Sequence, residues 1–286
     1  SPSKTSVDRI EFANDTATGT PKGPLSAGRQ YYGATGNTSF GYFAGGAPSV
    51  ISSVDRIDYS SDTSTASPKG PLSFAKGNSQ GCGNMSFGYW AGGNGNNSNV
   101  DRIDYSSDTS TASPKGQLEN SRSTMAASGN SNFGYWSGGY PYYTKASRID
   151  YANDTATAAP KGQLPADKDD VGATGNINFG YFGGGDPASS GGSYVERIDY
   201  SNDTVNASRR GVLSASRRYL TATGNASYGY FAGGGSSGTS IVDRLDYGND
   251  TATAITKGPL SGDSLRFGMA AVSAQENGLA GRTPQN

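Results

Sequence analysis

The side chains of this sequence that could do chemistry are carboxylates, lysines and tyrosines, because there is no histidine and only one cysteine, Cys82. Without histidine, a Ser-His-Asp or Cys-His centre in its usual form is excluded. The commonest ligand for zinc, copper and iron is also missing. Cys82 stands between two glycines on an expected inner strand, and we interpret it as a small buried residue. We therefore predict no catalytic residue, no metal site and no cofactor.

One cluster of aspartates stands out among the acidic residues. Asp167, Asp169 and Asp170 lie within four residues of each other, and Asp263 stands in the equivalent part of the last repeat. A glycosidase needs two carboxyl groups at a fixed separation across a cleft. Nothing in the sequence places a second carboxyl opposite this cluster of aspartates. A glycosidase or lyase is thus the alternative, and a binding protein is the prediction.

The most repeated charge is an arginine in the pattern Asp-Arg-Ile-Asp-Tyr. It recurs with spacings of 47, 46, 46, 49 and 47 residues, as Arg9, Arg56, Arg102, Arg148, Arg197 and Arg244. A ligand site repeated six times is one interpretation. We favour a structural one, in which each arginine bridges to a carboxylate or carbonyl between repeats. The Asn-Asp-Thr triplets that follow are interpreted as turns closed by their own side chains, with calcium ligation or glycosylation as the alternatives.

These charges belong to six units of about 47 residues, each of which predicts four short strands, A to D. In one unit they are residues 33–36 (small residues), 40–46 (aromatic, ending in Gly-Gly), 54–59 and 68–72. Four strands per unit at this period are typical of a β-propeller blade. We predict an all-β fold in which residues 1–286 form a single six-bladed propeller of four-stranded antiparallel blades.

The ends of the chain predict how the ring closes. The sequence begins with strands C and D, near residues 7–12, and ends with degraded copies of strands A and B at residues 267–271 and 278–281. We expect the N-terminal pair and the C-terminal pair to form one blade. That arrangement leaves no open sheet edge at the seam.

The Gly-Gly that ends strand B, the aromatic before it and the Asp-Arg-Ile-Asp-Tyr strand resemble the kelch family. The tryptophan that kelch units carry on strand D is missing, and Thr-Ala-Ser-Pro-Lys stands there instead. The units Val-Asp-Arg-Ile-Asp-Tyr and Phe-Gly-Tyr-Phe-Ala-Gly-Gly look like repeat proteins of marine bacteriophages, especially cyanophages. Galactose oxidase shares the kelch propeller, but its copper needs histidines, so that activity does not carry over.

Sequence differences between the units predict where a ligand binds. The A–B and C–D turns are nearly uniform, whereas the B–C and D–A turns vary, and antiparallel strands place all the variable turns on one face. This face is expected to carry aromatic side chains and a basic ring at the axis. The ring is interpreted as the kelch family's structural arginine, with contact to an acidic glycan as the alternative. The candidate ligand-binding residues are Tyr31, Phe74, Tyr140, Tyr142, Tyr143, Lys145 and Tyr219, with Arg29, Lys76, Arg122, Lys168 and Arg217 as the ring.

We accordingly expect a non-catalytic recognition module on a phage tail or virion surface, or outside the cell. Its expected partner is a host-surface glycan or another virion protein. The formal net charge of −1 argues against nucleic acid, which would favour a basic excess. No apolar run is long enough to span a bilayer, so no membrane insertion is expected.

Overall fold

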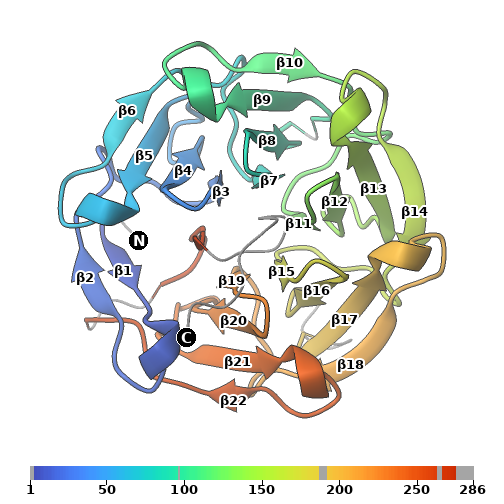
Figure 1. The fold of residues 1–286 in the computed structure, drawn as a ribbon. Coiled ribbons are helices and arrows are strands. Elements are labelled where there is room, and N and C mark those ends of the chain that lie inside the picture. The colour runs from blue at the N-terminus through green and yellow to red at the C-terminus, as the bar shows by residue number, and fades with distance from the viewer. Residues whose placement is uncertain (1–2, 96, 187–191, 263–265, 275–286) are drawn as a thin grey trace.

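The computed structural model describes residues 3–95, 97–186, 192–262 and 266–274, and these form a β-propeller (Figure 1). Five four-stranded antiparallel sheets and one two-stranded sheet are arranged in sequence order around a central axis. Strand A of each complete blade lies nearest the axis and strand D lies at the rim (Figure 1). The all-β propeller predicted from the repeats is therefore confirmed, with five of its blades complete among the described residues.

The strands follow the predicted order A, B, C, D in every complete blade. Blade 1 contains β3 (Gly33–Gly36), β4 (Phe40–Ala44), β5 (Val54–Asp58) and β6 (Ser67–Lys69). Blade 2 contains β7 (Gln80–Gly83), β8 (Phe87–Ala91), β9 (Val100–Asp104) and β10 (Ser113–Lys115). Blade 3 contains β11 (Ala126–Gly129), β12 (Phe133–Ser137), β13 (Lys145–Asp150) and β14 (Ala159–Gln163). Blade 4 contains β15 (Gly172–Gly175), β16 (Phe179–Gly183), β17 (Tyr194–Asp199) and β18 (Ser208–Val212). Blade 5 contains β19 (Thr221–Gly224), β20 (Tyr228–Ala232), β21 (Val242–Asp246) and β22 (Ile255–Thr256).

Blade 6 contains β1 (Val7–Arg9) and β2 (Thr20–Lys22), which are its strands C and D. We expected residues 267–272 in the same sheet. Among the described residues they form no strand in that sheet, which consists of β1 and β2. The expected strand B, at residues 278–281, lies outside the described residues.

Residues 266–274 nevertheless occupy the place of strand A in blade 6. Val272 covers Gly41 of blade 1, where a Cβ would lie 2.7 Å from its Cγ2, and Thr35 covers Gly88 of blade 2 in the same way. Arg266 forms an ion pair with Asp8 of β1 at 3.0 Å. The two ends of the chain therefore meet in one blade, as the repeats predicted.

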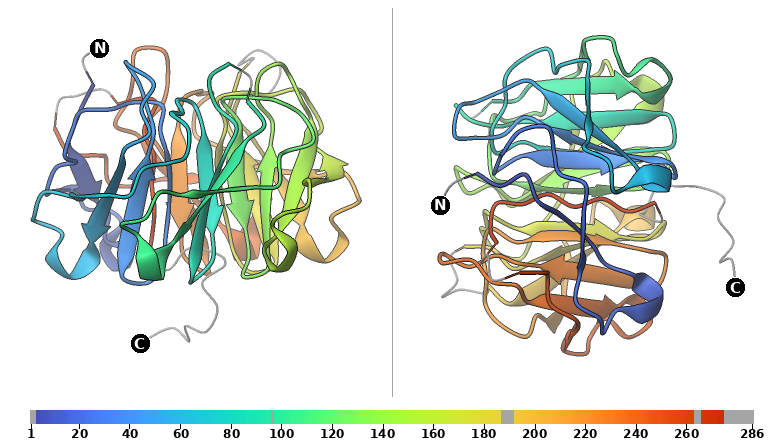
Figure 2. Two further views of the ribbon diagram at one scale, coloured as in Figure 1. Left: turned by 90° about the horizontal axis from the view of Figure 1, so that it is seen from above. Right: turned by 90° about the vertical axis from the view of Figure 1, so that its left-hand side faces the viewer.

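A short 3-10 turn joins strands C and D in each blade, and these turns lie along one face of the disc (Figure 2). In five of them the aspartate that ends strand C accepts a hydrogen bond from the backbone amide two residues later, as Asp58 does from Ser60. The turns are η1 (Phe12–Asn14), η2 (Tyr59–Ser61), η3 (Tyr105–Ser107), η4 (Tyr151–Asn153), η6 (Tyr200–Asn202) and η7 (Tyr247–Asn249).

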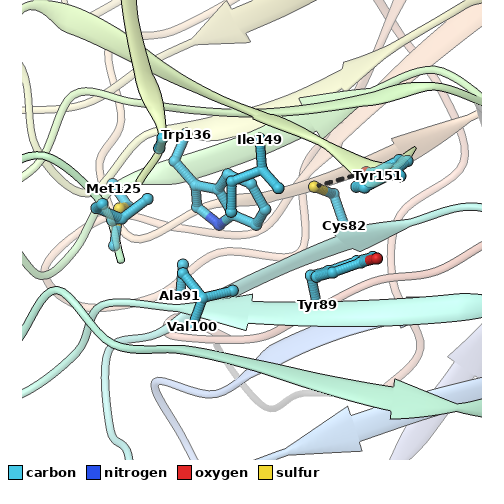
Figure 3. Close-up of a cluster of buried hydrophobic side chains, with 10 residues drawn as sticks. Cys82, Tyr89, Ala91, Val100, Met125, Trp136, Ile149 and Tyr151 are labelled. Carbon is cyan, nitrogen blue, oxygen red and sulfur yellow. Dashed lines mark hydrogen bonds between the residues drawn. The ribbon is translucent and has the colours of Figure 1, made fainter. Parts of the chain in front are cut away.

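The hydrophobic core consists of separate clusters where neighbouring blades meet. Between blades 2 and 3, Trp136 and Tyr151 pack with Tyr89 and Cys82 (Figure 3). The Cys82 thiol lies 3.4 Å from the Tyr151 hydroxyl and is buried, as its glycine neighbours suggested. Repeating this thin core around the ring lets a chain with only 33% hydrophobic residues bury its aromatic side chains.

Charged side chains also join the blades, as the structural interpretation of the repeated arginine predicted. Arg56 of blade 1 donates to Asp108 of blade 2 at 2.7 Å, and Tyr42 donates to the same carboxylate at 2.9 Å. The aspartate of each Asn-Asp-Thr or Ser-Asp-Thr triplet thus binds the preceding blade. The arginine pairs are Arg9–Asp62, Arg56–Asp108, Arg102–Asp154, Arg148–Asp203, Arg197–Asp250 and Arg244–Asp15.

Candidate functional site

The variable turns lie together on the face opposite the 3-10 turns (Figure 2). Isolated backbone bridges tie five of the six D–A turns to a B–C turn, and in the sixth the Gly235 amide donates to the Arg218 carbonyl, so the turns form a connected surface. The bridges are Gln30–Ala47, Ile51–Lys76, Ser123–Tyr140, Asp169–Asp186 and Thr239–Arg266. Their side chains are therefore held on a scaffold of hydrogen bonds.

The expected basic ring lies beneath this face, not on it. Its five side chains are buried, with relative exposures of only 1% to 4%: Arg29, Lys76, Arg122, Lys168 and Arg217. They are held by strand C of their own blade, where most meet a carboxylate. Arg29, for example, donates to Asp55 at 3.0 Å. This agrees with the structural interpretation of the ring. The alternative, that these side chains contact a ligand, is corrected because they are already paired and covered.

Arg122 differs from the rest of the ring. Ser147 stands where the other units have aspartate or glutamate, and the Arg122 guanidinium donates to its hydroxyl and to the carbonyl oxygens of Trp136 and Lys145. Burial lowers the pKa of Arg122 to about 10. The group remains charged at neutral pH and serves as a donor to four acceptors of its own blade, the fourth being the carbonyl oxygen of Gly138.

A closed ring of backbone hydrogen bonds marks the mouth of the axis on this face. In each D–A turn one residue adopts a positive φ, between 54° and 61°, and its amide donates to the carbonyl of the corresponding residue in the preceding blade at 2.6 to 3.1 Å. The members are Tyr31, Asn78, Thr124, Asp170, Tyr219 and Gly268. The ring closes at Gly268 and shows that six units surround the axis.

Three aromatic rings gather on one side of this mouth. Tyr31 and Tyr219 meet edge to face with 5.7 Å between ring centroids, and Phe267 lies 6.2 Å from each. All three are half-buried. The opposite side carries the polar side chains of Asn78 and Thr124. The mouth thus combines an aromatic surface with hydrogen-bonding groups.

An acidic cluster adjoins the aromatic trio. Burial, together with the negative charges of Asp169 and Asp186, raises the pKa of the Asp170 carboxyl to about 7, and Tyr219 beside it acts in the opposite direction. Arg218 pairs with Asp186 at 2.8 Å and opposes the rise. At neutral pH Asp170 is therefore partly protonated and can donate as well as accept a hydrogen bond.

The turn at residues 140–145 forms a second exposed patch. Tyr140 and Tyr142 are 47% and 53% exposed and meet edge to face at 5.7 Å. Tyr143 is half-buried, with the Arg122 guanidinium 5.9 Å from its ring centroid. Lys145 is exposed at the start of β13. Two tyrosines of this turn are thus open to solvent.

The remaining sequence-predicted residues are not all brought together. Phe74 is 50% exposed on another D–A turn and makes no ring contact with the other aromatics of the described chain. Asp167 is exposed beside the acidic cluster, and Asp263 lies outside the described residues. The predicted residues that meet at the mouth are Tyr31 and Tyr219, together with Asp169 and Asp170.

Sequence reasoning missed Phe267, Arg218 and Asp186 at the mouth. Phe267 stands just before Gly268, which aligns with Tyr31 once the units are matched on Arg266 and Arg29. That alignment was the available signal. The other units carry different residues at the positions of Arg218 and Asp186, so the repeat pattern did not single out these two residues.

No known protein family matches the chain, and no curated protein is similar to it. Nowhere in the described residues is there a helix long and apolar enough to cross a membrane. The described acidic and cysteine side chains form no group of three that could hold a metal ion. The site is therefore interpreted from its own geometry.

Proposed function

We propose that this protein is a non-catalytic recognition module that binds an oligosaccharide at the mouth of its axis. The observation that supports this most directly is the trio of Tyr31, Tyr219 and Phe267 beside the polar group around Asp170. Amphipathic aromatic rings offer an apolar surface together with hydrogen-bonding hydroxyls. A sugar, with its alternating C–H and O–H groups, matches that combination.

The backbone ring favours binding because it preorganises the mouth. Its positive-φ residues are fixed by hydrogen bonds to neighbouring blades, so little conformational entropy is lost when a ligand binds. The resemblance to kelch and cyanophage repeat proteins favours a virion tail or surface as the setting, with a host glycan as the ligand.

A glycan array of bacterial surface oligosaccharides tests this proposal. The parent chain should bind at least one glycan, and Tyr219→Asn should weaken that binding roughly tenfold. Asparagine tolerates the positive φ at this position, as Asn78 does in the same ring, so the backbone should stay intact. Tyr140→Ser, in the separate turn, is the matched control. Binding that survives Tyr219→Asn would contradict the proposal.

A carboxylate enzyme is the second candidate, and the raised pKa of Asp170 is the observation that favours it. A glycosidase would need a second carboxyl across a cleft. Asp167, Asp169 and Asp170 do not line the cavity of about 460 Å³ that lies beside β1 and residues 269–272. Asp170→Asn separates the two candidates, since it would abolish hydrolysis of a bound glycan by an enzyme and leave a binding module's affinity within a few fold.

A second patch favours another virion protein as an additional partner. Tyr140 and Tyr142 are exposed side by side, and tyrosine is enriched in protein interfaces.

A further inference from the structure

Blade 6 contains a cavity of about 460 Å³ where the other blades carry strand B. Val7, Ile10 and Phe12 line it from the β1 side, and Met269, Ala270 and Val272 line it from the side of the axis. Tyr32, Phe43 and Ile57 of blade 1 complete the apolar wall. No described residue fills the space between β1 and residues 269–272, so the inner edge of β1 faces the cavity.

The five complete blades show which side chains a strand B carries at this position and what those side chains contact. Each strand B there reads aromatic, glycine, tyrosine, then Phe or Trp, then a small residue. The tyrosine hydroxyl donates to the aspartate of the next blade in the pairs Tyr42–Asp108, Tyr89–Asp154, Tyr135–Asp203, Tyr181–Asp250 and Tyr230–Asp15. The first aromatic ring lies 4.2 to 4.4 Å below the strand C guanidinium in the pairs Phe40–Arg56, Phe87–Arg102, Phe133–Arg148, Phe179–Arg197 and Tyr228–Arg244.

The groups that would meet a strand B in blade 6 are present beside the cavity: the acceptor Asp62 of blade 1 and the guanidinium of Arg9 in blade 6. Asp62 still pairs with Arg9 and Lys22, but no tyrosine of the described chain donates to it. Its side chain is 15% exposed, against 7% to 8% for the other five aspartates. The Arg9 side chain is 46% exposed, against 21% to 25% for the other five arginines. The cavity therefore offers an acceptor and a cation face that elsewhere meet a tyrosine and an aromatic ring.

The end of the chain matches this position in spacing and differs from it in side chains. Counting from Ser273, which aligns with Gly36, residues 277–281 read Asn-Gly-Leu-Ala-Gly. Leu279 stands for the tyrosine, and Asn277 stands for the first aromatic. Ala274 replaces the asparagine that caps the A–B turn in every complete blade, as Asn37 does for Ser39 and Phe40. Residues 274–281 therefore lack the capping asparagine, the first aromatic residue and the tyrosine that accompany strand B in the complete blades.

We propose that blade 6 is an acceptor groove for a β-strand supplied by a partner protein. The strand pairs antiparallel with β1 and carries the pattern aromatic, glycine, tyrosine, aromatic, small. Its tyrosine donates to Asp62, its first aromatic lies under Arg9, and its backbone satisfies the free edge of β1. Strand addition of this kind takes affinity from main-chain hydrogen bonds and specificity from alternate side chains. The groove is separate from the mouth of the axis, so this proposal does not depend on glycan binding.

A synthetic peptide with the sequence of residues 38–46, Thr-Ser-Phe-Gly-Tyr-Phe-Ala-Gly-Gly, is the probe. Fluorescence anisotropy should show saturable binding to the full chain. The same peptide with Tyr42→Phe should bind about tenfold more weakly, because it cannot donate to Asp62. The phenylalanine peptide is the more apolar of the two, so non-specific apolar association would give the opposite order.

Two chain variants locate the binding. Asp62→Ala should remove the difference between the two peptides. Asp108→Ala should preserve it, because Tyr42 of the chain itself already occupies that aspartate. Absence of saturable binding, or equal affinities for the two peptides on the parent chain, would overturn the proposal. Binding only to a chain that ends at Ala274 would also overturn it, by showing that residues 275–286 are the natural occupant.

Discussion

The aspartate at each blade junction is the residue that does most to join neighbouring blades. Asp154 accepts from Tyr89 at 2.9 Å and Arg102 at 2.8 Å, with Lys115 at 3.2 Å. Burial and the bond to Asp154 raise the pKa of Tyr89 well above its usual value, which keeps its hydroxyl protonated as a donor. One carboxylate thus satisfies three groups across an interface that is too thin to hold a large core.

We predict that Asp154→Asn lowers the free energy of unfolding by about 1–3 kcal/mol, because two partly buried cations, Arg102 and Lys115, lose their counter-charge. Urea unfolding at pH 7 measures the loss. Asp62→Asn is the matched control, since this aspartate is more exposed and has no tyrosine donor in the described chain. The Asp62→Asn control should lose less free energy of unfolding. Equal losses for the two variants would contradict a stabilising role of the hydrogen bond from Tyr89 to Asp154.

The Asp170 carboxyl predicts a pH dependence of stability in the opposite direction from the junction aspartates. Its folded pKa of about 7 lies above the ordinary value of 3.8, so between these values the folded state holds a proton that the unfolded state has lost. The free energy of unfolding therefore falls as pH rises through this window. By contrast, the pKa values of Asp15 and Asp203 are lowered by their tyrosine, lysine and arginine partners against the effect of burial, so their contribution is lost only in acid.

Asp170→Asn removes the titration and suits the positive φ of 54°. We expect the variant to gain stability relative to the parent between pH 5 and pH 8, by at most about 4 kcal/mol at the alkaline end. Thermal melting at several pH values measures it. A constant difference across this range would show that Asp170 does not titrate there.

At the scale of the elements, the repeat predicted strands A to C closely. Strand A at Gly33–Gly36 and strand C at Val54–Asp58 fall where the small residues and the Asp-Arg-Ile-Asp pattern placed them. Strand D of blade 1 begins one residue earlier than expected and ends at Lys69, whereas β14 and β18 run two residues further along the unit, to Gln163 and Val212. How the strands of one blade align with those of the next depends on contacts between blades, and the sequence of a single unit does not show it.

The candidate site was predicted less completely than the fold. The grouping of variable turns on one face followed from the alternation of antiparallel strands. The structural interpretation of the basic ring agrees with the burial of Arg29 and Lys76, but the hypothesis that the ring contacts a ligand does not, because the sequence of a turn does not show how deeply its side chains are buried. The mouth was only partly predicted because Tyr31, Thr124 and Asp170 share a backbone conformation and no residue type.

The turn at residues 140–145 gives a prediction at this scale. Tyr142→Ala with Tyr143→Ala should weaken binding to host envelope extract or to a virion partner by roughly 1–3 kcal/mol if the turn anchors a partner. The fold should persist, because Tyr142 is half exposed and Tyr143 is only half-buried. Tyr194→Ala, on β17 in blade 4, is the control of similar exposure. Unchanged binding with unchanged melting would remove this turn from the candidate site.

At the scale of the whole molecule, the ring is held closed by both ends of the chain. Residues 266–274 complete the six-membered backbone ring at Gly268 and pack Val272 on blade 1. The N-terminal segment supplies β1 and β2 and the junction aspartate Asp15, which accepts from Tyr230 and Arg244 of blade 5. Contacts across the seam join residues more than 200 positions apart, so closure depends on the whole chain.

Deleting residues 1–20 should therefore open the propeller. The deletion removes β1, the Asp15 carboxylate that Tyr230 and Arg244 share, and the Asp15 carbonyl that accepts from Gly258. It also leaves Asp62 without Arg9. Each lost group contributes on the order of 1 kcal/mol or more, and 1 kcal/mol shifts the melting temperature of a domain this large by about 2–4 °C. We expect the melting temperature to fall by more than about 10 °C in differential scanning calorimetry. Removing residues 275–286 instead should have a much smaller effect, because the described seam contacts remain. Equal melting temperatures for the parent and the N-terminal deletion would show that the five complete blades hold the ring without the seam.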